Sequence, residues 1–487
     1  MKKMSKKSAA IFMSLITAVA ASVSLAGCGG AGGSSEASAT SAEQATTQSA
    51  ETTAAAATQA ATSASQTSRL AESDITINET LSNGENGGHA ITADGESADY
   101  SNVLVTKTGD SEGDEADFYG ENAAVFATNK ATLNLNNIVV KSNGAHANGV
   151  FSYGEGTTVN ISDSYISTTG NCSGGLMTTG GGTMNASNLT VETTGNSSAA
   201  IRSDRGGGTV NVSGGYYSTS GKGSPAVYST ADITVSDAVL SSSTSEGVVV
   251  EGKNSVTLNN VSLTADHNAH NSDKSDNYQA VMIYQSMSGD AAQGLSGFTM
   301  NGGSLVNKSG DIFFVTNTAT EINLNNVSFT NEGGGVFLRA EAAGWGTEGS
   351  NGGQVNLNAE NQTIDGDIAV DSVSKLNLYL KGSSALTGAI NSGGAAGEVY
   401  VELENGSTWT LTADSYISSL TCEAGAVKLN GHKLYINGVE YTEGTASQGS
   451  AVEITVSTDG GHEAPPDGQT PPDGGNKPDG EPPAKPD

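Results

Sequence analysis

The chain has 487 residues, of which 36% are apolar and only 5% aromatic, while glycine fills 64 positions. This composition argues against a compact α/β enzyme and is typical of either disorder or a thin, stacked β architecture. The formal charge, 21 − 52 = −31, argues against nucleic acid and anionic membrane surfaces as partners, because both attract basic patches. It is compatible with a solvated surface protein or with one that holds divalent cations.

The N-terminus has the pattern of a targeting segment. A basic stretch, "MKKMSKK", precedes an apolar stretch, "AAIFMSLITAVAAS", and then "LAGC" ends at Cys28. Small residues before a cysteine at this spacing resemble the bacterial lipoprotein lipobox, which implies cleavage before Cys28 and a lipid on its sulfur. We therefore expect residues 1–27 to be a signal peptide and Cys28 to anchor the mature protein to the outer face of the cell membrane. An ordinary secretory signal with an incidental cysteine is the alternative.

Residues 28–72 follow as a segment of Ser, Thr, Ala, Gln and Gly, which cannot bury a core and is predicted to be a flexible tether. The last residues, 459–487, are rich in Pro, Gly and Asp and are predicted to be a disordered tail. Between these ends, residues 73–458 are expected to form the folded part of the chain.

An acidic stretch, "DSEGDEADFYGE", lies near the start of the folded part. It places Asp110, Glu112, Asp114 and Glu121 at positions 1, 3, 5 and 12 of an EF-hand-like loop, which makes them candidate Ca²⁺ ligands. Glu115 stands where such a loop requires glycine, so the alternative is an acidic loop that holds no ion. A second candidate, "DHNAHNSD" with His267, His270 and Asp273, has metal-ligand residue types at loose spacing, and the alternative is a solvated loop.

The folded part is built from a repeated phrase. Its copies include "LNLNNIVV" from Leu133, "VNISDSYI" from Val159, "MNASNLTV" from Met184 and "VNVSGGYY" from Val210, and the first six copies start at spacings of 26, 25, 26, 23 and 23 residues. Apolar and polar residues alternate, which predicts a strand, and a turn pair and a second apolar pair follow. The second residue of each turn pair is always Asn, Asp or Gly, which tolerate a left-handed backbone. These residues are Asn137, Asp163, Asn188, Gly214, Asp237, Asn260, Gly302 and Asn326.

A further short strand follows in each unit, for example "NGVFSY", "GGLMTT" and "AAIRSD". Three short strands in 23 to 26 residues, without a helical period, predict one coil of a parallel β-helix. We expect about fifteen such coils, stacked at roughly 4.8 Å, so that equivalent residues form ladders. The fold class is therefore all-β, a single-stranded solenoid with disordered ends, and we expect a monomer.

The phrases resemble those of the right-handed parallel β-helix superfamily, whose members include the pectate lyases. They are most similar to lipid-anchored clostridial β-helix surface proteins, some of which are described as adhesin-like or carbohydrate-binding. The resemblance covers most of the chain, but its motifs specify the fold rather than the function.

The register of the repeat predicts which side chains face outward on the strand that carries "AAIRSD". One outward row contains Phe151, Met177, Arg202, Tyr228, Val249 and Met282, and the next contains Tyr153, Thr179, Asp204, Thr230, Glu251 and Tyr284. The corresponding positions on the first strand are plainly Asn and Thr. Insertions at residues 264–279, 285–297 and 341–353 are expected to wall the "AAIRSD" sheet on both sides and make it a groove. The predicted ligand-binding residues are Phe151, Tyr153, Arg202, Asp204, Tyr228, Glu251, Tyr284 and Trp345.

Three functions remain open from the sequence. The first is non-catalytic binding of a polysaccharide or host glycan, on aromatic faces flanked by hydrogen-bonding groups. The second is a polysaccharide lyase or glycoside hydrolase of the same fold, although the polygalacturonase, HExxH and GxSxG signatures are absent and the pectate lyase motifs cannot be placed. The third is a structural spacer. We expect no cofactor other than Ca²⁺, and an ordinary surface ion pair is the alternative interpretation of Arg202 with Asp204.

Overall fold

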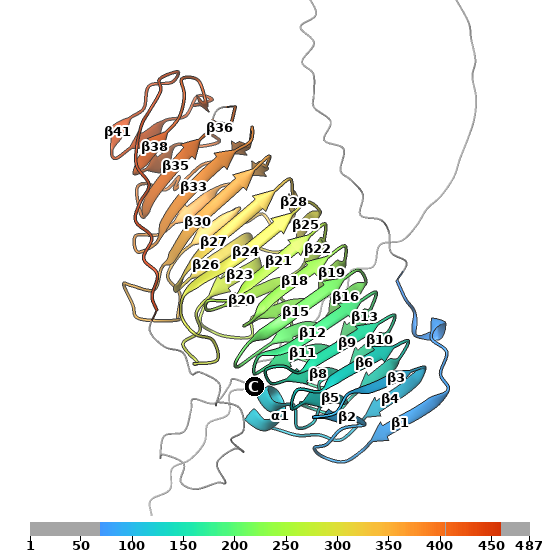
Figure 1. The fold of residues 1–487 in the computed structure, drawn as a ribbon. Helices are drawn as coiled ribbons and strands as arrows, with labels where there is room; N and C mark the ends of the chain where they lie inside the picture. The colour runs from blue at the N-terminus through green and yellow to red at the C-terminus, as the bar shows by residue number, and fades with distance from the viewer. Residues whose placement is uncertain (1–68, 405, 459–487) are drawn as a thin grey trace, which may run out of the picture. The chain divides into compact units, whose positions relative to one another are not determined.

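The computed structural model describes residues 69–404 and 406–458. Cys28, the predicted signal peptide, the tail and all of the tether except residues 69–72 lie outside the described residues. Within them the chain is nearly all β. It is a right-handed parallel β-helix in which most coils contribute one strand to each of three long sheets, named sheets A, B and C (Figure 1).

Sheet C carries the first strand of each repeated phrase, where the alternating pattern predicted it. Its 13 strands are all parallel to their neighbours. They are β3 (Ala98–Ser101), β6 (Thr132–Asn136), β9 (Thr158–Ser162), β12 (Gly182–Ser187), β15 (Gly208–Ser213), β18 (Asp232–Ser236), β21 (Ser255–Asn259), β24 (Leu295–Asn301), β27 (Thr318–Asn325), β30 (Gly353–Glu360), β33 (Lys375–Lys381), β35 (Glu398–Leu403) and β38 (Ser419–Thr421). The stack therefore has 13 levels in this sheet rather than about fifteen, because the insertions use part of the chain.

Sheet A follows sheet C in each coil, across the turn pair. Its ten strands carry the second apolar pair of the phrase. They are β1 (Glu79–Asn83), β4 (Val103–Lys107), β7 (Val139–Ser142), β10 (Tyr165–Thr168), β13 (Thr190–Thr193), β16 (Tyr216–Thr219), β19 (Val239–Ser242), β22 (Ser262–Ala265), β25 (Ser304–Asn307) and β28 (Ser328–Asn331).

Sheet B completes the coil and carries the strand of "AAIRSD". Its 11 strands are β2 (Ile91–Asp94), β5 (Val125–Thr128), β8 (Val150–Tyr153), β11 (Leu176–Thr179), β14 (Ile201–Ser203), β17 (Val227–Ser229), β20 (Val248–Glu251), β23 (Gln279–Tyr284), β26 (Asp311–Thr316), β29 (Leu338–Ala340) and β32 (Ile368–Val370). Later coils use two smaller sheets. One contains β31 (Thr363–Asp365), β34 (Ala385–Thr387), β36 (Thr408–Thr410) and β39 (Val427–Lys428), and the other β37 (Ser415–Ile417), β40 (Leu434–Ile436) and β41 (Val439–Glu440).

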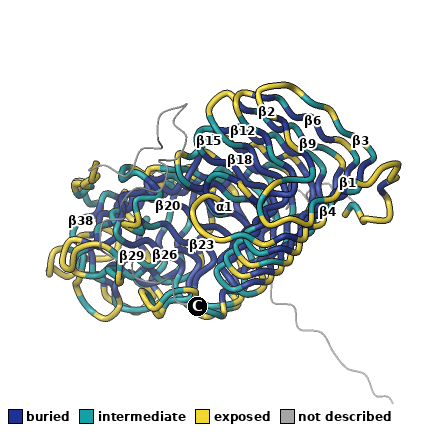
Figure 2. The backbone as a smooth tube through the Cα atoms, turned by 90° about the horizontal axis from the view of Figure 1, so that it is seen from below, coloured by how far each residue is buried: buried dark blue, intermediate teal, exposed yellow. Residues whose placement is uncertain are grey.

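The core is a continuous column of Val, Ile, Leu and Ala inside the coils, and the loops at the corners are the exposed parts (Figure 2). The turn between sheets C and A has one backbone conformation throughout, as predicted. All eight residues named above for this turn have a positive φ, between 48° at Asp163 and 71° at Gly214.

The described residues also contain two helical segments, one before the first strand and one between β4 and β5, and the sequence did not predict either. The shorter is the 3₁₀ turn η1 (Glu72–Asp74), and the longer is α1 (Asp114–Tyr119). Acidic residues in the first turn of α1 favour its positive N-terminal end, and Gly120 closes it with a left-handed φ of 80°. No helix among the described residues is long and apolar enough to span a bilayer.

Candidate functional site

The predicted outward rows of sheet B have the register that the repeat implies. Phe151 pairs with Met177, Met177 with Arg202, Arg202 with Tyr228, Tyr228 with Val249 and Val249 with Met282. In the next row Glu251 pairs with Tyr284. Side chains from coils more than a hundred residues apart in sequence therefore form one surface.

Much of that surface is covered. Phe151 and Met177 have no exposed area, because they pack with Ala123, Phe126 and Tyr153 in a cluster of their own. Tyr119 of α1 stacks edge-on against Tyr153, with 5.7 Å between ring centroids. The expectation that Phe151 presents its ring to a ligand is therefore wrong for this conformation. Tyr153 lies in the same covered cluster, and neither residue lines the pocket described next.

A pocket of about 290 Å³ opens further along sheet B, and it collects five of the predicted residues. We call it the sheet-B pocket. A smaller hollow of about 140 Å³, lined by Trp345 and His267 among others, adjoins it and shares Tyr228, Tyr284 and Asn271 with it. The residues that line the sheet-B pocket are Phe118, Ser197, Ala199, Arg202, Asp204, Gly223, Pro225, Tyr228, Glu251, Asn271, Tyr284, Ser286, Ser288 and Asp290.

Glu251 is the centre of the pocket's hydrogen bonds. Its carboxylate accepts from the hydroxyl groups of Tyr228 and Ser286 and, at 3.2 Å, from that of Tyr284. The side chain is only 1% exposed, and this desolvation raises the pKa of Glu251 to about 7 although the hydroxyl donors oppose the shift. Burial, followed by the nearby carboxylate, also raises the pKa of both tyrosines. Glu251 can therefore exchange a proton near neutral pH.

Asp204 and Arg202 form an ion pair in the same pocket. Nη2 of Arg202 donates to Oδ2 of Asp204 at 2.7 Å, and the backbone N–H of Arg205 donates to Oδ1 at 3.1 Å. Burial raises the pKa of Asp204, while the Arg202 guanidinium opposes that shift. Both side chains are largely buried, so this is a buried ion pair and not the exposed surface pair that the sequence left open. It gives the pocket a fixed carboxylate and a fixed cation.

Arg205, which the sequence analysis did not select, contacts two residues that line the pocket, Phe118 and Asp290. It donates to Asp290 at 2.6 Å and to Asp114 at 2.8 Å, and its guanidinium lies 3.8 Å from the ring centroid of Phe118. Asp290 and Ser286 were also missed individually, although their insertion was identified as a wall. Insertions have no ladder register, so nothing in the sequence indicated which of their side chains turn inward.

The three predicted insertions do flank sheet B, and two of them contact each other. The backbone N–H of Gly344 donates to the carbonyl of Lys274 at 2.7 Å, and Asn277 donates to Glu341 at 2.9 Å. Trp345 lies edge-on against Tyr284, with 5.2 Å between ring centroids. The insertion at 341–353 thus places the indole ring of Trp345 in the adjoining smaller hollow, against Tyr284.

The four acidic residues proposed for Ca²⁺ are not gathered into one ligand set among the described residues. Asp114 begins α1 and pairs with Arg205, Asp110 accepts from the backbone of Ala145, and Glu121 accepts from Ser111. An EF-hand loop is wrong here because the middle of the stretch is helical. Glu112 belongs to the same interrupted loop.

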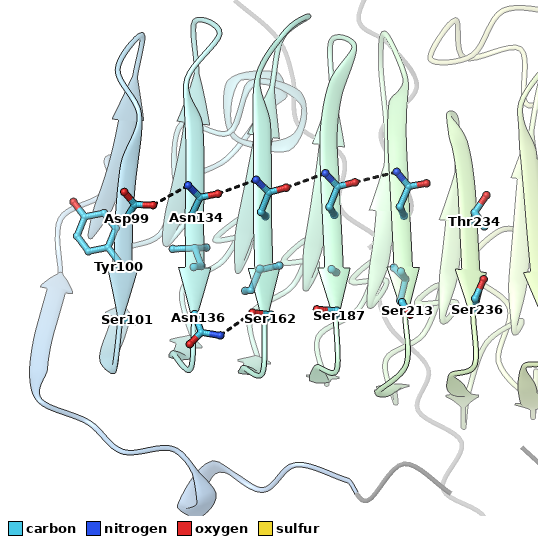
Figure 3. Close-up of a pocket in the computed structure, with 17 residues that line it drawn as sticks. Asp99, Tyr100, Ser101, Asn134, Asn136, Ser162, Ser187, Ser213, Thr234 and Ser236 are labelled. Carbon is cyan, nitrogen blue, oxygen red and sulfur yellow. Dashed lines mark hydrogen bonds between the residues drawn. The ribbon is translucent and has the colours of Figure 1, made fainter. Parts of the chain in front are cut away.

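A larger but shallower hollow of about 800 Å³ lies on the outer face of sheet C (Figure 3). Its floor is an asparagine ladder in which Asn134 donates to Asp99 and Asn160, Asn185 and Asn211 each donate to the preceding asparagine at 2.8–3.0 Å. The amides therefore satisfy one another. This face contains no cluster of buried charges, in contrast with the sheet-B pocket.

No protein-family model matches the chain, and no significant match was found among curated proteins or solved structures. The function must therefore be argued from the site itself.

Proposed function

We propose that this chain is a bacterial surface protein of the pectate-lyase-like superfamily that binds a saccharide in the sheet-B pocket. The observation that carries the proposal is the convergence of Arg202, Asp204, Tyr228, Glu251 and Tyr284, from four coils, on one concave site. Sugar recognition combines an aromatic face with hydrogen-bonding groups that fix the hydroxyls. Tyr284 supplies an aromatic ring in this pocket, and Trp345 lies against it in the adjoining hollow.

The size of the pocket restricts the ligand. A volume of about 290 Å³ is at the lower end of the range for ligand pockets, which favours a chain end or a short oligosaccharide. The carboxylates of Asp204, Glu251 and Asp290 disfavour a polyanionic glycan unless Ca²⁺ bridges it, so we propose a neutral glycan as the first choice. Nucleic acid is disfavoured for the same reason, and the binding unit is proposed to be a monomer.

The location of the protein rests on its N-terminal sequence. The lipobox-like "LAGC" supports attachment through Cys28 to the outer face of the membrane, as in the lipid-anchored clostridial proteins that the repeats resemble. A pocket on such a protein would meet glycans outside the cell, which supports an adhesin-like role.

Glycan cleavage is the second candidate, and one observation favours it. Glu251, with its pKa raised to about 7, has the protonation behaviour of a general acid, and a second carboxylate, Asp204, lines the same pocket. Asp204 is held by Arg202, however, and this ion pair leaves it poorly placed to act as a base or nucleophile. Binding without cleavage therefore accounts for the site better.

A glycan array probed with the purified protein tests the proposal. We expect a restricted set of ligands for the wild type and at least a tenfold loss of affinity in Trp345→Ala. Tyr416→Ala is the matched control, because Tyr416 belongs to an aromatic pair with Tyr435 in β37 and β40, outside the pocket. Arg202→Ala is unsuitable, since it would leave the Asp204 carboxylate unpaired at a cost of about 3–5 kcal/mol.

Two results would contradict the proposal. An array without any ligand would overturn saccharide binding, and an equal loss in Trp345→Ala and Tyr416→Ala would move the site elsewhere. New reducing or unsaturated ends in a bound glycan would favour cleavage, and Glu251→Gln should then abolish them.

A further inference from the structure

The smaller hollow beside the sheet-B pocket differs from the pocket in size and in the kind of groups that line it. Its volume is about 140 Å³, and five residues line both spaces: Gly223, Pro225, Tyr228, Asn271 and Tyr284. A ligand in the sheet-B pocket therefore lies next to the hollow. Ligand pockets usually measure about 300–1,000 Å³, so a hollow of this size suits a substituent of a bound sugar better than a second sugar ring.

Part of the hollow's lining is apolar. Val249 and Met282, from the outward row of sheet B, are 5% and 6% exposed, and Trp345 packs against the cluster that they form. A hydroxyl group placed against these side chains would lose hydrogen bonds to water, whereas a methyl group gains free energy by leaving water. This part of the hollow therefore favours a substituent that carries a methyl group.

The hollow is also lined by a hydrogen-bond acceptor that lacks a donor. Gln279 is 2% exposed, and its Oε1 accepts no hydrogen bond from the residues that the structure describes. Its amide cannot turn over to relieve this, because Nε2 donates to the Glu246 carboxylate at 2.9 Å and a carboxylate only accepts. Buried polar atoms are nearly always paired, so an N–H or O–H group from outside the protein is expected at this oxygen.

His267 supplies a donor in the same hollow. The residue is 4% exposed, and its Nδ1 accepts from the backbone N–H of Gln279 at 3.4 Å. Burial lowers the pKa of His267, although Glu246 opposes the shift, so the imidazole is neutral at neutral pH. A neutral imidazole whose Nδ1 accepts carries its proton on Nε2, which can then donate. The hollow thus combines a donor, an acceptor and an apolar surface.

We propose that the hollow receives the acetamido group of an N-acetylhexosamine whose ring lies in the sheet-B pocket. The methyl group of the ligand lies against Val249 and Met282, its N–H donates to Gln279, and its carbonyl oxygen accepts from His267. A hydroxyl group on the same carbon leaves the apolar surface uncovered. The inference rests on saccharide binding in the sheet-B pocket and adds the class of sugar.

A metal ion is the alternative occupant that the two histidines of the hollow suggest. His270 stacks on Tyr278 with 4.1 Å between the ring centroids. The set of three metal-ligating side chains found within residues 69–404 and 406–458 lies at Asp117, His146 and Cys172, and neither histidine of the hollow belongs to it. This arrangement favours an organic ligand over a metal ion.

Matched pairs of sugars test the inference. The purified protein is titrated by calorimetry with the methyl β-glycosides of N-acetylglucosamine and glucose, and of N-acetylgalactosamine and galactose. Chitotriose and cellotriose form a third pair. The members of each pair differ only in an acetamido group or a hydroxyl group at C2. In at least one pair we expect the acetamido member to bind about tenfold more tightly or better, which is the effect of roughly one additional hydrogen bond.

Two variants place the preference in the hollow. Gln279→Met removes the acceptor and keeps the length of the side chain, and Val249→Phe fills the apolar part of the hollow. Each should abolish the preference for the acetamido member while the hydroxyl member binds as it does to the wild type, which also shows that the variant is folded. Gln354→Met is the matched control, because Gln354 also has an unpartnered Oε1 but lines a different hollow.

The outcomes separate this inference from saccharide binding itself. Equal affinities within every pair would overturn the acetamido inference and leave saccharide binding in place. A preference that survives in both Gln279→Met and Val249→Phe, or that is lost equally in Gln354→Met, would also overturn it. If none of these sugars binds but the glycan array yields another ligand, the inference alone is wrong. An array without any ligand would overturn both.

Discussion

At the scale of single residues, one backbone conformation is required in coil after coil. The second residue of the turn between sheets C and A is left-handed, and Asn188, with φ of 51°, is typical. Asn188 also donates through its amide to Oδ1 of Asp163 in the previous coil at 2.7 Å. A β-branched residue is disfavoured there by backbone sterics and lacks this hydrogen bond.

Asn188→Val should therefore lower the free energy of unfolding by about 1–2 kcal/mol or more. Thr234→Val is the control, because it places the same residue at an outward position of β18 with an extended backbone. Thermal melts of both variants measure the difference. Equal melting temperatures would mean that the turn does not impose its conformation.

Glu251 couples the stability of the fold to pH. Its pKa is raised from 4.5 to about 7, so the folded state binds this proton more tightly than the unfolded chain does. The resulting stabilisation is complete below about pH 4.5 and is lost as the pH rises through 7. By the size of the shift, the loss is about 3 kcal/mol.

Glu251→Gln removes this titration. Between pH 5 and pH 8 the stability of the wild type should fall by about 2–3 kcal/mol relative to that of the Gln variant. Urea unfolding at several pH values measures both proteins. Parallel stability curves would contradict the raised pKa of Glu251.

At the scale of elements, the coils could be predicted because each one repeats the same pattern of alternating apolar residues and turn residues. The alternating pattern placed the three strands of each coil, and their ladder register put Arg202 beside Tyr228. The segments that lie against the outer face of sheet B could not be predicted in this way. Six residues outside the repeat form α1, and Phe151 is buried in a cluster with Ala123 and Met177. The insertions do not follow the repeat, so only the structure shows that residues such as Ser286 and Asp290 line the pocket.

Close contact between coils also depends on glycine at one corner. A Cβ added at Gly195 would lie 1.8 Å from the carbonyl oxygen of Gly170 in the previous coil. Gly195→Ala therefore forces the two coils apart locally.

We expect Gly195→Ala to destabilise the protein by about 1–3 kcal/mol or more, as overpacking does in other cores. Gly393→Ala is the matched control, since a Cβ there meets no atom within 4 Å. Chemical denaturation of the two variants makes the comparison. If the two variants are equally stable, the coils can move apart at Gly195 with little cost in free energy.

At the scale of the whole molecule, the hollow on sheet C differs in kind from the sheet-B pocket. The face of sheet C is open and its asparagine amides are bonded to one another, while the sheet-B pocket concentrates buried carboxylates, an arginine and two tyrosine hydroxyls. Buried polar groups that converge on a cavity are the usual mark of a ligand site.

Membrane attachment is a separate prediction at this scale, and it rests on residues outside those that the structure describes. Cys28→Ala should leave the protein unprocessed or release it from the membrane. Partitioning into detergent and the mass of the mature chain measure both effects. Normal processing and partitioning of the variant would contradict a lipid at Cys28.

The most direct test of saccharide binding is a crystal structure of the protein with its strongest ligand from the glycan array. The account predicts a sugar ring against Trp345 and Tyr284, with hydroxyl groups hydrogen-bonded to Glu251 and to the Arg202–Asp204 pair. A saccharide bound along the asparagine ladder of sheet C, with the sheet-B pocket empty, would contradict it.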